Sequence, residues 1–367
     1  MEFTCNRDNL IEGINIVQRA IPSRSTVPVL EGMLLEVGEE LKLTGNDTEL
    51  GIEYEVPAII EEIGSIVVNS KTFGDIIRKL PDMYVTIKTI ENNNVMEISS
   101  GAADYKIKTM DPESYPKVIE IESEKEYKIL GTEIKDLIRK TIFAVSQDDM
   151  RPVLKGEFIE VTGQSMNFVA IDGYKMAVKS LSREDEILSS VIAPSRILSE
   201  VARFITSPEE EVTMILNENQ IMFKAKYFVM VSRLLKGEYL NYRSMIPREF
   251  KTDVIVKCKD FMAAIERATL VMTDERKFPL VLSISGSEIV ITANAEQGNS
   301  KETVNANVNG DDITLGFNSR NLLETLRAID DLEIKIFFTT DKGPCVIKSL
   351  ENEEDYTYMV MPILTRR

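Results

Sequence analysis

One phrase recurs three times along the chain. Its copies read VNSKTFGDIIRKL at 68–80, APSRILSEVARFI at 193–205 and FNSRNLLETLRAI at 317–329. Each copy brings a β-rich run to a serine and a basic residue, and continues as an apolar stripe with the spacing of an amphipathic helix. We expect Ser70, Ser195 and Ser319 to cap these helices. Because the serines lie 125 and 124 residues apart, the phrase predicts three domains built on one plan.

A second phrase, a strand followed by an amphipathic helix, opens each of the three units. It occupies residues 1–21, 126–145 and 253–272. Strand-like runs follow both phrases, so each unit holds two copies of a strand, a helix and several antiparallel strands. Each helix needs a sheet to cover its apolar face, which predicts an α+β fold with the helices on one side of the sheets.

Polar, proline-containing stretches separate the units at 111–126 and 241–253. They read as linkers and give three domains. We place the domains at 1–118, 126–245 and 250–367. The two end domains would have free sheet edges, which tend to pair with other chains. A second copy joined head to tail covers both edges and closes a ring.

Several classes of site are excluded by composition. The chain has no histidine, no phosphate-binding loop and no GxGxxG motif, and its three cysteines lie far apart. Nucleophiles activated by histidine and histidine-ligated metals are therefore ruled out, and we expect no enzyme activity, cofactor or metal. The scattered cysteines, the absence of a signal-like N-terminus and the absence of a long apolar run favour a cytoplasmic protein without a membrane contact.

Charge is distributed unevenly between the predicted helices and the rest of the chain. The whole chain carries a net charge of −17. The predicted helices together carry +5 and span 6–21, 67–80, 133–145, 195–205, 259–272 and 319–329. A mildly basic helix face suggests phosphate contacts that are independent of base sequence. Lysine and arginine are also well tolerated on any solvated helix, so the charge alone leaves both interpretations open.

In the order of its motifs, the whole chain resembles the β subunit of bacterial DNA polymerase III, the sliding-clamp family. The motifs are MEFTCNRDNL (1–10), IPSRSTVPVL (21–30), LTGNDTELGI (43–52), FVAIDGYKMAV (168–178), LLKGEYLNYRSMIP (234–247) and YMVMPIL (358–364). The resemblance implies a DNA clamp fold, in which three repeated clamp domains place helices inside and sheets outside a closed ring. It implies a head-to-tail homodimer that encircles double-stranded DNA, without base-sequence preference, and confers processivity. The expected partners are the replicative DNA polymerase, the clamp loader and other proteins that carry clamp-binding peptides.

The resemblance also implies site residues. An apolar peptide-binding pocket would comprise Leu154, Ile171, Gly173, Tyr174, Lys175, Met176, Leu240, Met245, Met359, Val360, Met361, Pro362 and Ile363. DNA contacts are expected at Arg24 and Arg196. At the dimer interface, Tyr105 and Ile107 of one copy would pack near Leu270 and Val271 of the other. Across the same joint, the expected charge pairs set Lys106 and Lys108 against Glu296 and Glu302.

The chain departs from the family pattern around this pocket. Relatives often have Thr-Asp-Gly-His-Arg-Leu where this chain has residues 171–176, proline at Leu240 and arginine at Ser244. We therefore expect a shifted peptide preference. A repeat scaffold that binds only proteins and never DNA is the alternative function. The positive balance of the predicted helices favours the clamp over this scaffold.

Overall fold

A computed structural model describes most of the chain, in four ranges. These are residues 1–90, 94–118, 121–272 and 279–363. The chain forms two compact units. Unit 1 contains 1–134 and 197–234, and unit 2 contains 135–196 and 235–367. The division therefore runs through the middle repeat rather than between repeats. Within the described ranges, no helix is long and apolar enough to cross a bilayer.

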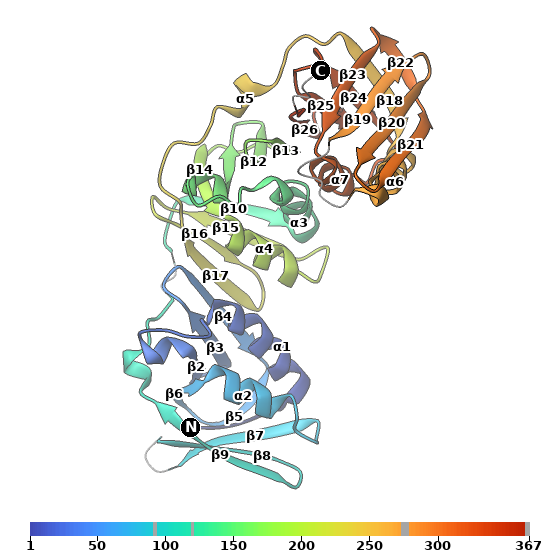
Figure 1. The fold of residues 1–367 in the computed structure, drawn as a ribbon. Helices are drawn as coiled ribbons and strands as arrows, with labels where there is room; N and C mark the ends of the chain where they lie inside the picture. Colours follow the sequence, from blue (N-terminus) through green and yellow to red (C-terminus); the bar gives the residue numbers. More distant parts are fainter. Residues whose placement is uncertain (91–93, 119–120, 273–278, 364–367) are drawn as a thin grey trace. The chain divides into compact units, whose positions relative to one another are not determined.

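Unit 1 is built on one antiparallel sheet (Figure 1). From edge to edge its strands are β10 (Lys125–Leu130), β15 (Glu211–Leu216), β16 (Gln220–Lys224), β17 (Phe228–Arg233), β4 (Leu50–Val56), β3 (Leu41–Asn46), β2 (Gly32–Val37), β6 (Gly64–Asn69), β9 (Ala103–Met110), β8 (Val95–Ser100), β7 (Tyr84–Ile90), β1 (Glu2–Asn6) and β5 (Ala58–Glu62). Strand β17 pairs with β4, with Phe228 opposite Tyr54 and Val231 opposite Gly51. The sheet of the first repeat thus continues without a break into strands of the middle repeat.

Unit 2 contains two antiparallel sheets. The larger sheet runs β14 (Ser189–Pro194), β11 (Gly156–Val161), β12 (Ser165–Ile171), β13 (Lys175–Ser182), β26 (Tyr356–Val360), β25 (Cys345–Ser349), β24 (Glu333–Phe338), β18 (Thr252–Lys257) and β22 (Asn307–Gly310). The smaller sheet runs β21 (Gly298–Asn305), β20 (Glu288–Ala295), β19 (Leu280–Ser285) and β23 (Ile313–Phe317). Strands β13 and β26 pair with Met176 opposite Met359, which joins the middle repeat to the last.

The six predicted helices are confirmed. They are α1 (Arg7–Val17), α2 (Ser70–Ile77), α3 (Gly131–Arg139), α4 (Ser195–Phe204), α6 (Cys258–Ala268) and α7 (Ser319–Arg327). Short 3₁₀ turns continue α1, α3 and α6, at Gln18–Ala20, Ile142–Ala144 and Thr269–Val271. An additional short helix, α5 (Tyr242–Met245), lies in the stretch predicted as the second linker.

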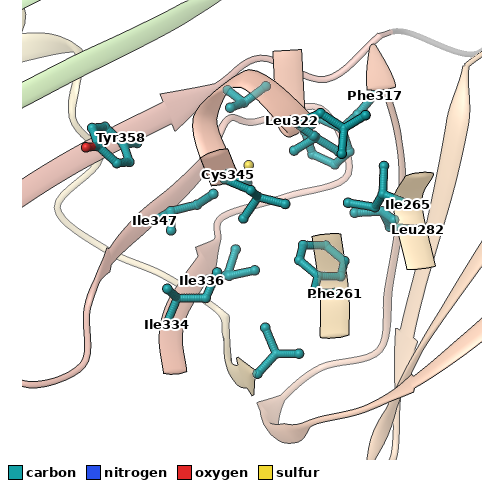
Figure 2. Packing of buried hydrophobic residues seen from close by; sticks show 14 of the residues in the cluster. Phe261, Ile265, Leu282, Phe317, Leu322, Ile334, Ile336, Cys345, Ile347 and Tyr358 are labelled. Atoms are coloured by element: carbon teal, nitrogen blue, oxygen red, sulfur yellow. The ribbon is translucent and has the colours of Figure 1, made fainter. Parts of the chain in front are cut away.

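Each helix buries its apolar stripe against a sheet. Helix α1 packs on β3 and β4 with α2 beside it, and α6 packs on β20 and β21 with α7 beside it. Figure 2 shows the core of the last repeat, where Phe261 and Ile265 of α6 meet Leu282, Leu322 and Cys345. These five side chains are almost completely buried. Burial of the apolar face that the repeated phrase encodes therefore stabilises these helices.

The helix caps differ from the prediction by one residue. Helices α2, α4 and α7 begin at the repeated serines. The prediction that Ser70 and Ser319 are caps is wrong, because the asparagine before each serine is the cap. Asn69 caps α2 by accepting the backbone N–H of Thr72 at 3.0 Å. Asn318 caps α7 by accepting two backbone N–H groups. An asparagine side chain one residue earlier reaches these orphan donors better than the serine, which is already helical.

Candidate functional site

Strands β13 and β26 present different residues on their two faces. On one face, Met176 and Met359 pack with Leu154 and Ile171 in an apolar cluster. On the other face, Ala177 and Tyr358 belong to the core beneath the helices, and Figure 2 shows Tyr358 among the residues of this core. The alternation is that of any β-strand, and it sets the outer cluster apart from the helix-side core.

The outer cluster, called here the Met176 cluster, is formed by strands of the middle and last repeats. Its buried members are Leu154, Val169, Ile171, Met176, Val178, Tyr242, Phe337, Val346 and Met359. Its partly buried members are Val153, Phe158, Tyr239, Met245, Ile246 and Phe250. Met176 and Met359 face each other across β13 and β26 within it, and methionine adapts its shape to an incoming apolar group more readily than branched side chains do.

The segment that carries helix α5 packs over one side of the Met176 cluster. Tyr239 stacks on Phe158 with ring centroids 5.2 Å apart. The Tyr242 hydroxyl donates to Glu160 at 2.9 Å, and Arg243 donates to both oxygens of the same carboxylate. These bonds, chiefly those from Arg243, hold the pKa of Glu160 below its ordinary value despite partial burial. An ionised Glu160 thus anchors this segment to strand β11.

Three apolar side chains next to the cluster are accessible to solvent. Tyr174 is 68% exposed, Leu240 43% and Met361 37%. Leu240 precedes α5, and Met361 follows strand β26. Tyr174 follows Gly173, whose φ of +93° closes the hairpin between β12 and β13. The sequence Asp172-Gly173 suits such a turn, because glycine adopts a positive φ without strain.

Lys175 has its charged group on the helix side of the sheet. It is 7% exposed, and its Nζ atom lies 2.9 Å from Asp172 and 2.9 Å from Glu324 of helix α7. Burial lowers the pKa of Lys175, but bonds to the two carboxylates outweigh this effect and keep the pKa above its ordinary value. The residue is therefore a buried cation behind the cluster and not part of its apolar surface.

The structure brings five of the 13 predicted pocket residues together in one cluster. Leu154, Ile171, Met176, Met245 and Met359 share the Met176 cluster. Gly173, Tyr174, Leu240 and Met361 are exposed, and Pro362 and Ile363 are partly buried. The side chain of Val360 is fully buried in the helix-side core, because it alternates with Met359 along β26.

Several cluster residues were not predicted from the sequence. Tyr239, Tyr242, Phe158 and Val153 all contribute to the Met176 cluster. Two of them belong to the run EYLNYRSM at 238–245, in which Tyr239 lies just before the predicted linker at 241–253 and Tyr242 lies within it. Two tyrosines so close together in a polar stretch are the signal that could have identified them, because tyrosine is enriched where an apolar ring packs and its hydroxyl finds a partner.

Arg24 and Arg196, the two predicted DNA contacts, are both exposed and belong to different units. Arg24 lies at an open hollow of about 540 Å³ in unit 1, which Lys71 and Arg78 also line. Glu31 and Asp75 line the same hollow, so its charge is mixed. Arg196 is the second residue of helix α4.

Basic side chains on the helices are largely paired with carboxylates. Arg320 donates to Glu324 at 2.8 Å, Arg327 to Glu266 at 2.8 Å, and Arg267 to Glu302 at 2.6 Å. Arg139 forms ion pairs with Asp136 and Asp330, and Arg78 with Asp75. The positive balance predicted for the helices is thus partly neutralised by their neighbours, which leaves a weak field for phosphate groups.

The predicted interface involves the edges of two strands, β9 and β21. Strand β9 pairs with β8 along Ala103–Lys108, and its other side meets β6 only at Thr109 and Met110. Tyr105 on β9 is 39% exposed and Ile107 is half-buried. Strand β21 is an end strand of its sheet. Each of these two strands therefore has main-chain groups available to a further strand.

The apolar side chains expected at the joint are accessible to solvent, whereas two of the charged ones are already paired. Leu270 is 82% exposed and Val271 half-buried, in the turn after α6. Within the single chain, two of the four charged residues expected to pair across the joint already have other partners. Lys106 lies 3.2 Å from Glu97, and Glu302 is bonded to Arg267.

The chemistry of the cysteines does not favour catalysis or metal binding. Cys5, Cys258 and Cys345 are all buried. Burial raises the pKa of Cys5 and Cys345 to about 12 and that of Cys258 to about 11, so their reactive thiolate forms are disfavoured. Among the described residues, no group of three or more cysteine, aspartate or glutamate side chains is arranged to hold a metal ion.

Three family models match the chain in order. They are the N-terminal, central and C-terminal domains of the DNA polymerase III beta subunit, at residues 1–119, 128–241 and 243–364. The beta sliding clamp of Bacillus subtilis is 31% identical over 379 aligned residues, and that of Staphylococcus epidermidis 32% over 378. Each alignment covers all of both chains.

Solved structures agree with these matches. The DNA polymerase sliding clamp of Bacillus subtilis superimposes with a TM-score of 0.95 at 30% identity. A DnaN sliding clamp from Pseudomonas aeruginosa bound to griselimycin superimposes with a TM-score of 0.94 at 28% identity. Both superpositions cover the whole of each chain. The likeness therefore extends over every repeat.

Proposed function

Because the chain belongs to the DNA polymerase III beta subunit family, the β sliding clamps, we propose that two copies of it close head to tail into a ring around duplex DNA. The function of the chain is that of a DNA sliding clamp, a processivity factor and not an enzyme. The observation that carries this function is the ordered match of all three family domains along the chain. We place the protein in the cytoplasm, where its template lies.

The proposed ring joins strand β9 of one copy to strand β21 of the other. Both strands have main-chain groups available for pairing, and exposed apolar side chains lie close by. Leu270 is the clearest of these, since a leucine that is 82% exposed gains by burial in an interface. Tyr105 and Ile107 are the proposed partners of Leu270 and Val271 across this joint.

Within the ring, the clamp must hold DNA without gripping it. Strong phosphate contacts would slow sliding, and contacts to base edges would arrest it. Paired charges on the helices support weak contact: Arg327 and Arg320 are each already bonded to a carboxylate. We place the direct contacts at Arg24 and Arg196 and attribute retention mainly to ring closure.

The Met176 cluster is the proposed site for clients. A short peptide of the replicative polymerase or the clamp loader would lay apolar side chains against it, next to Leu240 and Met361. Two features support this assignment. The exposed side chains of Tyr174, Leu240 and Met361, called here the rim, are accessible to a peptide. The facing methionines Met176 and Met359 can adapt their shape to its apolar anchor residues. Griselimycin, the ligand of the Pseudomonas aeruginosa clamp, is proposed to bind the same cluster.

The alternative is a scaffold that binds proteins but not DNA. It predicts that the protein is not retained on circular DNA. The clamp would be loaded by the clamp loader and ATP onto a nicked circular plasmid and then passed over a sizing column. We expect it to elute with the circle and to be released when a restriction enzyme linearises the plasmid. Elution apart from the intact circle, with an active loader, would favour the scaffold.

A further inference from the structure

We propose that Glu324, on helix α7, is a positioning residue of the client site and acts through the ammonium group of Lys175. The inference rests on the proposed function, because it assumes that clients bind the Met176 cluster. Glu324 itself lies on the opposite side of the sheet from that cluster. Its effect on binding must therefore pass through the turn that Lys175 follows.

A short chain of charged contacts connects helix α7 to the turn. Oε2 of Glu324 lies 2.9 Å from Nζ of Lys175, and the same Nζ lies 2.9 Å from Oδ2 of Asp172. The other oxygen of Glu324, Oε1, accepts a hydrogen bond from Arg320 at 2.8 Å. Both oxygens of Glu324 are thus engaged, which fixes the position of its carboxylate.

Asp172 transmits this arrangement to the backbone of the turn. Its Oδ1 atom accepts the backbone N–H of Tyr174 at 2.7 Å and that of Lys175 at 2.8 Å. The Tyr174 carbonyl then accepts the backbone N–H of Met361 at 2.8 Å. The turn therefore controls the positions of two rim residues, Tyr174 on the hairpin and Met361 at the end of the last strand.

Removal of Glu324 should disturb the turn for an electrostatic reason. Lys175 is nearly inaccessible to water, so its charge depends on the two carboxylates. Without Glu324, the ammonium group keeps only Asp172, and it gains by moving toward solvent. Such a movement pulls on the Asp172 carboxylate, whose other oxygen holds the turn. The rim then loses its preformed geometry, which weakens client binding.

The same strand supplies a matched control. Lys179 on β13 has a side chain that is 8% exposed, against 7% for Lys175, and it also forms ion pairs with two carboxylates, Asp136 and Asp355. These partners do not belong to the turn at Asp172. Loss of Lys179 should therefore destabilise the sheet to a similar degree while leaving the rim in place.

The test compares Glu324→Gln, Lys175→Met, Lys175→Arg and Lys179→Met with the unchanged protein. Griselimycin would be titrated by calorimetry, and the replicative polymerase of the same cell by surface plasmon resonance. We expect Glu324→Gln and Lys175→Met to weaken both ligands by about tenfold. Lys175→Arg keeps a positive charge between the two carboxylates, so it should retain most of the affinity of the unchanged protein. Lys179→Met should keep its affinity for both ligands within about twofold, while urea unfolding is expected to show that it is less stable.

Two results would overturn the inference. One is unchanged affinity in Glu324→Gln, and the other is an equal loss in Lys179→Met, which would mean that any damage to the sheet is enough. If Glu324→Gln does not fold, Glu324→Asp retracts the carboxylate by one methylene and decides the question by the same criteria. Leu240→Asp distinguishes failure of the Glu324 inference from failure of the proposed client site. If this variant binds both ligands normally, the client site lies elsewhere.

Discussion

The hydroxyl of Thr141 lies 2.6 Å from Oε2 of Glu157, and both residues are inaccessible to water. The same hydroxyl lies 2.7 Å from the carbonyl oxygen of Leu137. A hydroxyl has one proton, and the carbonyl can only accept it. When Thr141 donates to Leu137, the proton in its contact with Glu157 must come from the carboxyl group. Burial raises the pKa of Glu157 to about 8, in accord with a protonated side chain.

Stability should therefore fall as the pH rises toward 8. Between the ordinary value of 4.5 and about 8, folded Glu157 keeps a proton that the unfolded chain releases. The free energy of unfolding then decreases by up to about 1.4 kcal/mol per pH unit from this group. Glu157→Gln removes the titration, so urea unfolding at pH 5 to 8 should show a flatter dependence in the variant. Parallel pH profiles for the two proteins would refute a protonated Glu157.

Charge at the proposed ring joint should separate the two copies. Tyr105→Asp combined with Ile107→Asp places two carboxylates where apolar burial is expected, and sedimentation should show monomers at micromolar concentration. Ile59→Asp is the control, because Ile59 is 67% exposed on β5, the end strand of the same sheet. A variant at Tyr105 and Ile107 that sediments as a dimer would move the joint elsewhere.

Charge at the rim of the Met176 cluster should weaken clients without unfolding the chain. Leu240→Asp and Met361→Asp each replace a partly exposed apolar side chain, and each should cost about 1–2 kcal/mol of binding free energy for griselimycin. Leu332→Asp is the control, since Leu332 is 80% exposed in the same unit and lies outside the cluster. Calorimetric titration gives the comparison, and equal effects at all three positions would argue against this site.

The corrected cap of helix α7 predicts opposite effects at adjacent residues. Asn318→Ala removes the acceptor for two backbone N–H groups and should lower stability by about 1 kcal/mol. The hydroxyl of Ser319 is buried and finds no hydrogen-bond partner in the described structure. Ser319→Ala should therefore leave stability unchanged or raise it slightly. Urea unfolding of both variants tests this, and a larger loss in Ser319→Ala would restore the serine as the cap.

Release of a paired arginine should strengthen contact with DNA. Glu266→Gln removes the carboxylate bonded to Arg327 on the helices proposed to face DNA. Binding to a short linear duplex should tighten, and the logarithmic salt dependence should steepen by about 0.9 for one added phosphate contact. Glu333→Gln removes the same charge from the start of strand β24. Identical salt slopes in the two variants, measured by fluorescence anisotropy, would contradict a DNA-facing role for Arg327.

The helices could be predicted from the sequence because their apolar stripes are local patterns. Helices α2, α4 and α7 begin at the repeated serines, as the phrase indicates. The cap itself could not be assigned, since asparagine and serine both favour that position and only the backbone conformation separates them. Helix α5 is too short for periodicity to reveal it within a polar stretch.

The candidate site was predictable only in outline. Strand β26 reads YTYMV and is apolar toward both faces, so its pattern does not tell which side Val360 occupies. The role of Lys175 depends on Glu324, which is distant in the sequence and which no local motif connects to it. The buried carboxyl of Glu157 reads as one more acidic residue among 60. Each of these features is created by contacts between repeats or between layers, which a linear pattern does not encode.

The pairing of β4 with β17 bears on how the chain can be divided for expression. A fragment cut at the end of the first repeat, such as 1–118, would lose β17 and leave β4 unprotected along Leu50–Tyr54. Most of that strand is buried in the intact chain. Its released N–H and C=O groups would recruit other strands, and the fragment should form inclusion bodies. Repeat boundaries in the sequence are therefore poor places to cut, and a soluble piece must carry residues 197–234 with the first repeat.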